Sequence, residues 1–225
     1  MVDSTYARSS VHVPLWARAF LTALTVLLAL VVARDLFGEE GAAPVQGDCV
    51  QQVWYGAQQL QPWYRRAADP ATMVKRAKVL RDFTDAACAE APPRRIWPRL
   101  AVALAFRESS IVPRVGLGKQ DGLRGERGYW QVMPNGKAES FVPRGCSQHS
   151  PECNAKSAMS YLAWLRDAPV EEGGCGSDDP FVWIGGYGRG HCPASPEAAR
   201  EWEEVQVARR LYCQLEPDCN TLWPE

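Results

Sequence analysis

The chain has 225 residues, with 25 lysines and arginines against 26 aspartates and glutamates, so its net charge is −1. This length suffices for one domain with a proper hydrophobic core and short appendages. The balanced charge argues against a nucleic-acid-binding stripe or a polybasic membrane-binding patch. The nine tryptophans favour core positions over a sugar-binding groove on composition alone.

An uncharged apolar run, AFLTALTVLLALVVA, occupies residues 19–33 between Arg18 and Arg34. Signal-peptide cores have about 7–15 apolar residues and spanning helices about 18 or more, so this run lies between the two. Neighbouring apolar residues extend it to residues 19–37. The flank of residues 1–18 is more positive than the segment after the run, which places the N-terminus in the cytoplasm. We favour an uncleaved inner-membrane anchor with the remaining chain in the periplasm, and secretion after signal cleavage is the alternative.

All of the cysteines follow the apolar run: Cys49, Cys88, Cys146, Cys153, Cys175, Cys192, Cys213 and Cys219. An even number on the exported side predicts four disulfides in an oxidising compartment. Proximity in the sequence suggests the pairs Cys146–Cys153 and Cys213–Cys219, and the other pairings stay open. The sequence contains no CxxC and no paired histidines, so we expect no metal site.

The region after the run begins with a linker and continues with helices. Residues 38–48, GEEGAAPVQGD, are the predicted linker, and residues 49–92 are a predicted helical region that braces the rest of the chain or docks a partner. One helix is predicted over residues 49–66. A second begins after Asp69 and Pro70, an N-cap followed by a first-turn proline. Its expected inner face consists of Met73, Ala77, Leu80, Thr84 and Ala87.

Helices also dominate the remaining chain. A third helix is predicted from Trp97 and Pro98 to about Ser109. Residues 114–128 contain five glycines and are predicted as a loop, in which a short β-hairpin is an alternative. Residues 128–134, GYWQVMP, are predicted as a short helical turn that Pro134 stops.

Two more helices complete the prediction. Asn154 is the expected N-cap of one, whose inner face is Ala158, Tyr161, Leu162 and Leu165. Ser195 and Pro196 open the last, whose inner side is Trp202, Val205 and Tyr212. Alternating strand patterns are rare, so the expected fold class is mainly α.

A carboxylate interrupts the apolar face of the third helix. The residues spaced four apart on that face are Ile96, Leu100, Leu104 and Glu108. Burial disfavours the charged form of a carboxyl and raises its pKa, which suits Glu108 to proton transfer. The spacing alone favours the simpler alternative, a helix-terminal glutamate that pairs with Arg107 or Arg114.

Four segments in order give Glu108 a wider context. They are ESSIVP (residues 108–113), GYWQVMP (128–134), NAKSAMSYL (154–162) and GGYGRG (185–190). Together they resemble the lytic transglycosylases of the goose-lysozyme-like superfamily, with their catalytic Glu-Ser segment, Gly-x-x-Gln-x-Met-Pro motif, Asn-to-Tyr-Leu helix and Tyr-Asn-Ala-Gly segment. The resemblance spans about residues 95–212 and implies that residues 93–225 form a lysozyme-like catalytic domain.

The sequence departs from the family pattern at three places. Gly188 and Arg189 stand where the family has asparagine and alanine, and the spacer between Glu108 and Gln131 is several residues longer than usual. Glu126 stands where many relatives have a small residue. These departures bear on substrate detail more than on the reaction class.

The resemblance implies cleavage of the β-1,4 bond between N-acetylmuramic acid and N-acetylglucosamine in peptidoglycan, without metal or cofactor. Glu108 is then the implied general acid and base. It protonates the leaving glycosidic oxygen and afterwards accepts the proton of the 6-hydroxyl, which yields a 1,6-anhydro product.

The implied substrate-binding residues are Ser109, Gln131, Met133 and Tyr187. Each has a structural alternative. The Ser109 hydroxyl could bind the backbone at its own helix end, and Met133 and Tyr187 could be core residues. For Gln131, the less favoured alternative is a polar side chain without function. By contrast, packing is favoured for Tyr161 and Leu162, and capping for Asn154.

Glu126 supports a second mechanism. If it faces Glu108, the pair suits a lysozyme-type hydrolase with two carboxylates. Otherwise it forms a salt bridge inside the loop with Arg124 or Arg127. Asp121 is a lesser candidate, as an exposed loop residue.

The expected partners are peptidoglycan glycan strands and, through the N-terminal segment, the membrane, with no nucleic acid. A protein partner in an envelope machine stays open. The rival of another class is a non-catalytic peptidoglycan-binding module of envelope assembly, against which Glu108 argues. A small disulfide-rich receptor domain is a weaker alternative.

Overall fold

The computed structural model describes residues 46–116, 118–134 and 136–219. The predicted N-terminal flank (1–18), the anchor or signal segment (19–37) and most of the linker (38–48) lie outside these residues. Within the described ranges, no helix combines the length and the apolar character that crossing a membrane requires.

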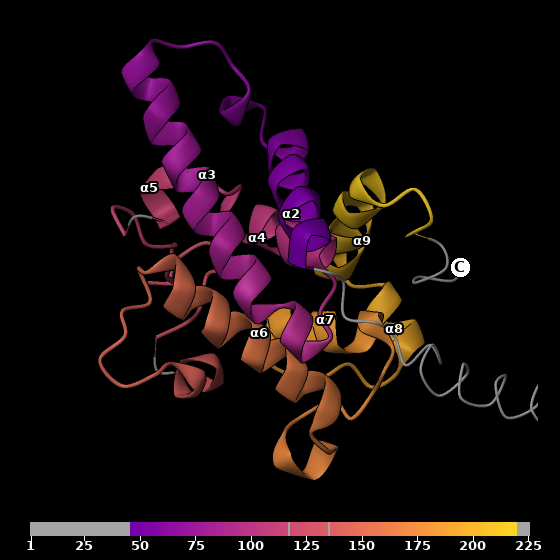
Figure 1. Cartoon of the computed structure of the whole chain (residues 1–225). Helices are drawn as coiled ribbons and strands as arrows, with labels where there is room; N and C mark the ends of the chain where they lie inside the picture. Colours follow the sequence, from indigo (N-terminus) through magenta and orange to yellow (C-terminus); the bar gives the residue numbers. More distant parts are fainter. Residues whose placement is uncertain (1–45, 117, 135, 220–225) are drawn as a thin grey trace, which may run out of the picture. The chain divides into compact units, whose positions relative to one another are not determined.

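The described part of the chain is mainly α-helical, as predicted (Figure 1). Its eight α-helices are α2 (Gln46–Leu60), α3 (Pro70–Glu90), α4 (Pro98–Ser109), α5 (Pro113–Gly116), α6 (Pro151–Asp167), α7 (Pro180–Arg189), α8 (Pro196–Arg200) and α9 (Glu203–Leu215). Short 3₁₀ turns are Pro62–Tyr64, Pro92–Arg94, Lys137–Phe141 and Val170–Glu172. The β-structure in these ranges amounts to one isolated bridge between Arg127 and Val132.

Helix α4 lies at the centre of the domain. It packs against α2 and α9, while α3 packs along α6 and α6 contacts α7. Every residue from 100 to 105 is fully buried. Helices α2 and α3 therefore belong to the same compact unit as the helices that follow them.

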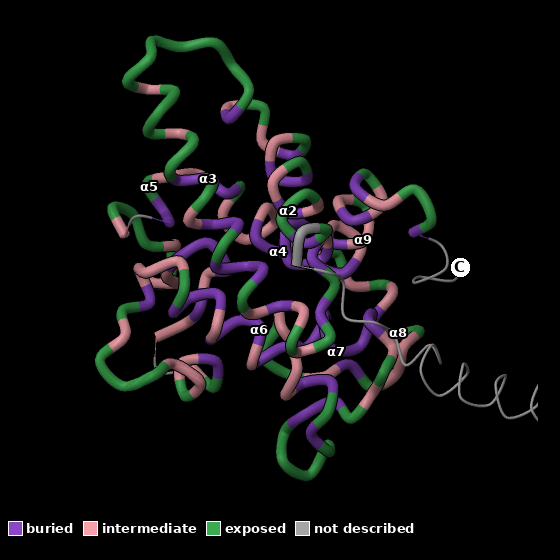
Figure 2. The backbone as a smooth tube through the Cα atoms, viewed as in Figure 1, coloured by how far each residue is buried: buried purple, intermediate pink, exposed green. Residues whose placement is uncertain are grey.

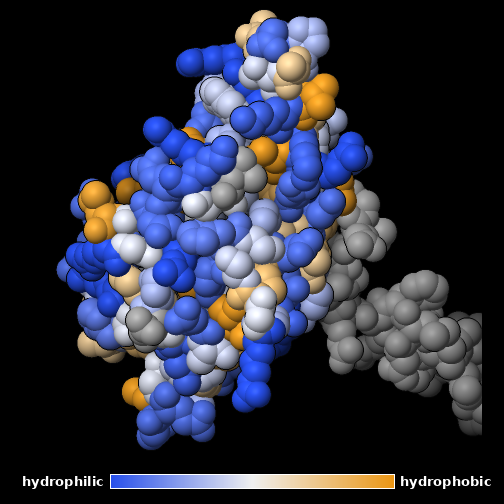
Figure 3. Space-filling view, turned by 90° about the vertical axis from the view of Figure 1, so that its left-hand side faces the viewer, coloured by the Kyte–Doolittle hydropathy of each residue, from blue (hydrophilic) through white to orange (hydrophobic). Residues whose placement is uncertain are grey.

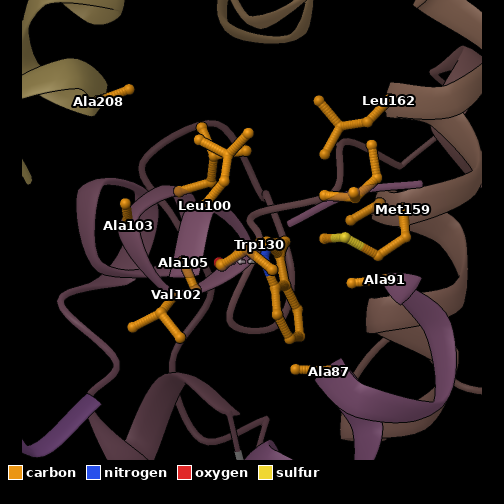
Figure 4. Packing of buried hydrophobic residues seen from close by; sticks show 14 of the residues in the cluster. Ala87, Ala91, Leu100, Val102, Ala103, Ala105, Trp130, Met159, Leu162 and Ala208 are labelled. Atoms are coloured by element: carbon orange, nitrogen blue, oxygen red, sulfur yellow. Dashed lines mark hydrogen bonds between the residues drawn. The ribbon is translucent and has the colours of Figure 1, made fainter. Parts of the chain in front are cut away.

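Trp130 completes the core between α4 and α6. Figure 4 shows its indole between Leu100 and Val102 of α4 and Met159 and Leu162 of α6. The indole nitrogen donates a hydrogen bond of 3.0 Å to the carbonyl oxygen of Ala101, so its polar atom is satisfied although the side chain is fully buried.

Capping signals predicted the start of several helices correctly. The Asp69 side chain accepts a hydrogen bond of 3.0 Å from the backbone nitrogen of Thr72, and Pro70 is the first residue of α3. Helix α4 runs from Pro98 to Ser109 as expected. The Ser195 side chain caps α8 by accepting from the backbone nitrogen of Ala198.

The predicted inner face of α3 is correct for three of its five residues. Leu80, Thr84 and Ala87 are buried, but Met73 and Ala77 are exposed. The first turns of α3 extend past the core, as the exposed stretch of the tube in Figure 2 shows.

Two helix boundaries also differ from the prediction. The first helix ends at Leu60 instead of residue 66, because Pro62 cannot continue it and starts a 3₁₀ turn. The predicted last helix is two helices. Trp202 has an extended backbone and is the N-cap of α9, so it is partly exposed, whereas Val205 and Tyr212 are buried as predicted.

The segment GYWQVMP is not a helical turn. Arg127 and Val132 exchange two backbone hydrogen bonds of 3.0 and 2.9 Å, which closes a tight loop between them. Within this loop, Gly128 (φ +72°) and Gln131 (φ +48°) adopt left-handed backbone conformations that interrupt a helix. The predicted helical turn is therefore wrong, and the β-bridge that replaces it begins at Arg127, at the end of the glycine-rich loop for which a hairpin was the alternative.

The eight cysteines form four disulfides: Cys49–Cys88, Cys146–Cys153, Cys175–Cys192 and Cys213–Cys219. The count and both expected pairings are confirmed. The first bridge joins α2 to α3. Four disulfides are typical of an oxidising, extracytoplasmic compartment.

Removing the α2–α3 bridge with Cys49→Ser and Cys88→Ser is expected to lower the free energy of unfolding by about 4 kcal/mol, because a long loop opens in the unfolded chain. The bridged residues are 39 positions apart, compared with 6 for Cys213 and Cys219. The matched double variant Cys213→Ser with Cys219→Ser should therefore lose only about 2 kcal/mol. Urea unfolding of the full chain measures both values, and equal losses would contradict the expectation.

Candidate active site

Glu108 lies in the last turn of the buried helix α4. The helix ends because Ser110 and Ile111 adopt left-handed backbone conformations, with φ of 53° and 50°. Leu104 and Leu100, one and two turns earlier on the same face, are fully buried. The Glu108 side chain is 20 % exposed, so the carboxyl lies where the core opens to solvent.

Two opposing effects act on the Glu108 carboxyl. Burial raises its pKa above the ordinary value of 4.5, and the negative charges of Glu126 and Glu204 act in the same direction. The adjacent guanidinium of Arg107 opposes the rise by pairing with the carboxylate. The net effect is a raised pKa.

Arg107 was expected only as one of two simple ion-pair partners, and it has further contacts. Its guanidinium also donates a hydrogen bond of 3.1 Å to the backbone oxygen of Glu204 in α9. A Cβ atom at position 188 would lie 3.1 Å from the guanidinium, so Gly188 leaves the space that Arg107 occupies. This packing gives a physical reason for glycine at position 188.

Two adjoining hollows meet at Glu108, and we call them together the Glu108 groove. One of about 460 Å³ includes Glu108, Ser109, Glu126 and Gln131 in its lining. The other, of about 370 Å³, includes Glu108, Glu126, Gln131, Met133 and Tyr187. Every candidate site residue from the sequence therefore lines the groove, although these residues come from α4, the glycine-rich loop and α7.

The side chains of Glu126, in the glycine-rich loop, and Gln131, in the segment GYWQVMP, lie side by side. The Gln131 side-chain nitrogen donates to the Gly128 carbonyl oxygen at 2.8 Å, and a Glu126 carboxylate oxygen accepts from the Arg124 backbone nitrogen at 2.8 Å. A Cβ atom at Gly122 would come within 2.4 Å of the ends of both side chains, so any larger residue there would displace them. The backbone nitrogen of Arg124 thus holds the Glu126 carboxylate. This contact replaces the salt bridge that was the alternative expectation with Arg124 or Arg127.

Asn154 is not the N-cap of α6, which is Ser150. The Asn154 side chain instead holds the loop between Arg127 and Val132. Its fully buried side chain accepts a hydrogen bond of 2.9 Å from the Trp130 backbone nitrogen. It also donates one of 2.8 Å to the Arg127 carbonyl oxygen. Gly128 packs directly against the same amide. Asn154 is therefore a positioning residue for the loop that carries Gln131.

Tyr187 also holds this loop in place. Its hydroxyl donates a hydrogen bond of 2.6 Å to the Trp130 carbonyl oxygen, and its ring lies 5.7 Å from that of Tyr161. Burial, followed by the nearby charge of Glu108, raises the pKa of the Tyr187 hydroxyl well above its ordinary value. Tyr187 is therefore neutral at physiological pH and presents its ring to the groove.

Ser109 has the structural role that the sequence left as its alternative. Its hydroxyl donates to the Ala105 carbonyl oxygen at 2.9 Å and accepts from the Ile111 backbone nitrogen at 3.2 Å. Both contacts stabilise the end of α4, and neither reaches Glu108. Asp121, the lesser candidate, lies at the edge of the groove 3.8 Å from His149.

Among the described residues, no group of three or more histidine, cysteine, aspartate or glutamate side chains has the arrangement of a metal site. No protein-family model, curated protein or solved structure matches the chain. The chemistry of the groove therefore follows from its own geometry.

The raised pKa of Glu108 predicts a pH-dependent cost to folding. The folded state retains the Glu108 proton to higher pH than the unfolded state, so the contribution of this group to stability is full below pH 4.5 and is lost as pH rises through the folded pKa. Glu108→Gln should thus match the wild type in acid and gain relative stability above that window. Urea unfolding across pH measures the difference, with Glu171→Gln on an exposed turn as the control. A difference that is constant with pH would contradict the assignment.

Proposed function

We propose that this domain is a lysozyme-like lytic transglycosylase that cleaves peptidoglycan glycan strands. The observation that carries the proposal is the half-buried carboxyl of Glu108, with a raised pKa, at the meeting point of two open hollows. The order of the four sequence segments supports the same activity.

A single carboxyl with a raised pKa suits both proton transfers of the reaction. Glu108 donates its proton to the glycosidic oxygen as the bond from C1 of N-acetylmuramic acid breaks, through an oxocarbenium-like state. The carboxylate then accepts the proton of the 6-hydroxyl while that oxygen bonds to C1. Arg107 stabilises the carboxylate between the two steps, because its guanidinium is already paired with Glu108.

The other groove residues have roles in binding. The Gln131 side-chain nitrogen is used on the Gly128 carbonyl, which leaves its oxygen to accept from an acetamido N–H or a hydroxyl of the glycan. Met133 and the ring of Tyr187 offer apolar surface to the sugar faces. Ser109 supports the helix end, so its variants should affect stability before they affect binding.

Glu126 favours a second candidate, a lysozyme-type hydrolase on the same fold. It lines both hollows together with Glu108, and its charge raises the pKa of Glu108. In such an enzyme, one carboxyl donates the proton and the other activates water or attacks C1. The products distinguish the two reactions, because hydrolysis leaves a reducing end where ring closure leaves a 1,6-anhydro sugar.

The proposed setting is the cell envelope. The disulfides fit an oxidising compartment, and an anchor in residues 19–37 would keep the enzyme beside the wall that it cuts. A protein partner in an envelope machine is compatible with this setting. The anchor and the partner remain predictions from the sequence.

Glu108→Gln is expected to lower the rate of anhydro-muropeptide release by about 10²- to 10⁴-fold, because the amide can neither donate nor accept the transferred proton. Glu126→Gln, the matched change in the same groove, should still release anhydro products. Digestion of purified peptidoglycan by the full chain, with products identified by mass, measures both.

Two other product patterns would each support a different function. Reducing-end products that disappear with either variant would replace the transglycosylase with the two-carboxylate hydrolase. Retained wall binding with no products from the folded, oxidised wild type would favour the non-catalytic envelope-assembly module.

A further inference from the structure

A basic pocket of about 690 Å³ adjoins the Glu108 groove. The loop after α2, the first turns of α3 and the segment around α5 form it. Its lining contains five basic residues and no acidic residue: Arg66, Lys75, Arg76, Arg114 and Lys119. Most of this pocket comes from residues 61–76, outside the stretch that resembles a known family.

The basic side chains of this pocket have no carboxylate partner among the residues that the structure describes. Asp69, which precedes the first turn of α3, directs its carboxylate to the backbone nitrogen and hydroxyl of Thr72. The pocket therefore attracts an anionic group from outside the chain.

Aromatic packing and hydrogen bonds give this pocket a defined wall. The Arg76 guanidinium lies 4.3 Å from the ring centroid of Trp63 and donates to the Arg66 carbonyl oxygen at 2.6 Å. Gln61 donates to the Ser110 carbonyl oxygen at 2.8 Å, and Tyr64 donates to that of Ile111 at 2.9 Å. The wall is thus fixed to the turn that ends α4, directly after Glu108.

The basic pocket and the Glu108 groove share part of their lining. Val112 and Arg114 line both the pocket and the hollow that contains Glu108 and Glu126. A side group on a polymer bound in the groove can therefore enter the pocket. The side of the domain seen in Figure 3 is mostly hydrophilic, with small separate hydrophobic patches, which suits a charged and hydrated ligand.

We infer that the basic pocket binds the carboxylates of the short peptides attached to the glycan strand, so that the domain prefers peptide-bearing strands to bare ones. The inference rests on the proposed function, which places a glycan strand in the groove. The sugars of a peptide-bearing strand carry no charge of their own, because the lactyl carboxyl of N-acetylmuramic acid is amide-linked to the peptide, whereas the attached peptides carry several carboxylates and amides. The carboxylates match the basic side chains, and the peptide atoms match the face of Trp63.

Strand binding by the full chain tests this preference without turnover, in the Glu108→Gln background. Three fluorescently labelled soluble strands serve as probes: strands with intact peptides, strands whose peptide carboxylates are amidated, and strands from which an amidase has removed the peptides and whose freed lactyl carboxylates are then amidated. Intact strands should bind at least about fivefold more tightly than the other two at low salt, and the difference should shrink as salt rises.

Arg66→Gln with Lys75→Gln should remove most of this preference. Both side chains are exposed and line only the basic pocket, so the fold and the affinity for bare strands should not change. Arg66→Lys with Lys75→Arg keeps the charge and should keep the preference. Arg81→Gln, an exposed change on α3 outside the pocket, is the control for loss of a positive charge elsewhere on the surface.

Equal affinity for intact and amidated strands, or an equal loss with Arg81→Gln, would overturn the inference. If the proposed function is wrong, the wild type will not cleave glycan strands, which is a different result from a lost binding preference. The binding preference can be measured in either case. Absence of strand binding by every variant would overturn both proposals.

Discussion

The anchoring of Trp130 is the interaction on which the rest of the site depends. Its indole fills the core and donates to Ala101 in α4, its backbone nitrogen donates to Asn154 in α6, and its carbonyl oxygen accepts from Tyr187 in α7. Phe83 of α3 stacks on the indole at 5.2 Å. One loop residue is thus bound to four helices. The neighbouring Gln131 is therefore held at a fixed place opposite the end of α4, although the loop has no regular secondary structure.

Burial of α4 sets the electrostatics that this loop faces. A helix with no exposed residue from 100 to 105 brings Glu108 to the boundary of the core, where a carboxyl loses hydration. Arg107 limits the resulting rise in pKa, and the absence of a side chain at Gly188 makes room for the guanidinium. The site therefore balances desolvation against one nearby cation. A carboxyl with a raised pKa is better suited to both giving and accepting a proton.

Local signals predicted much of the fold, and long-range contacts account for most of the rest. Asp69, Pro98 and Ser195 mark helix starts through chemistry within one turn, and the face that carries Glu108 follows from helical spacing. Asn154 was taken for a cap because its bonds to Trp130 and Arg127 join segments more than 20 residues apart in the sequence. The left-handed backbone of Gln131 likewise depends on the closed loop around it. The second role of Arg107 required the position of α9, which no local pattern encodes.

The basic pocket and the Glu108 groove both adjoin the turn at the end of α4, so the proposed substrate selection and the proposed chemistry share one structural element. The central claim is that burial raises the pKa of the Glu108 carboxyl and that the Arg107 guanidinium limits this rise. Direct titration of the Glu108 carboxyl by ¹³C NMR, in the wild type and in Arg107→Gln, tests it. The account predicts a pKa above 4.5 in the wild type and a higher value in the variant. A wild-type pKa at or below 4.5, or no rise in the variant, would contradict it.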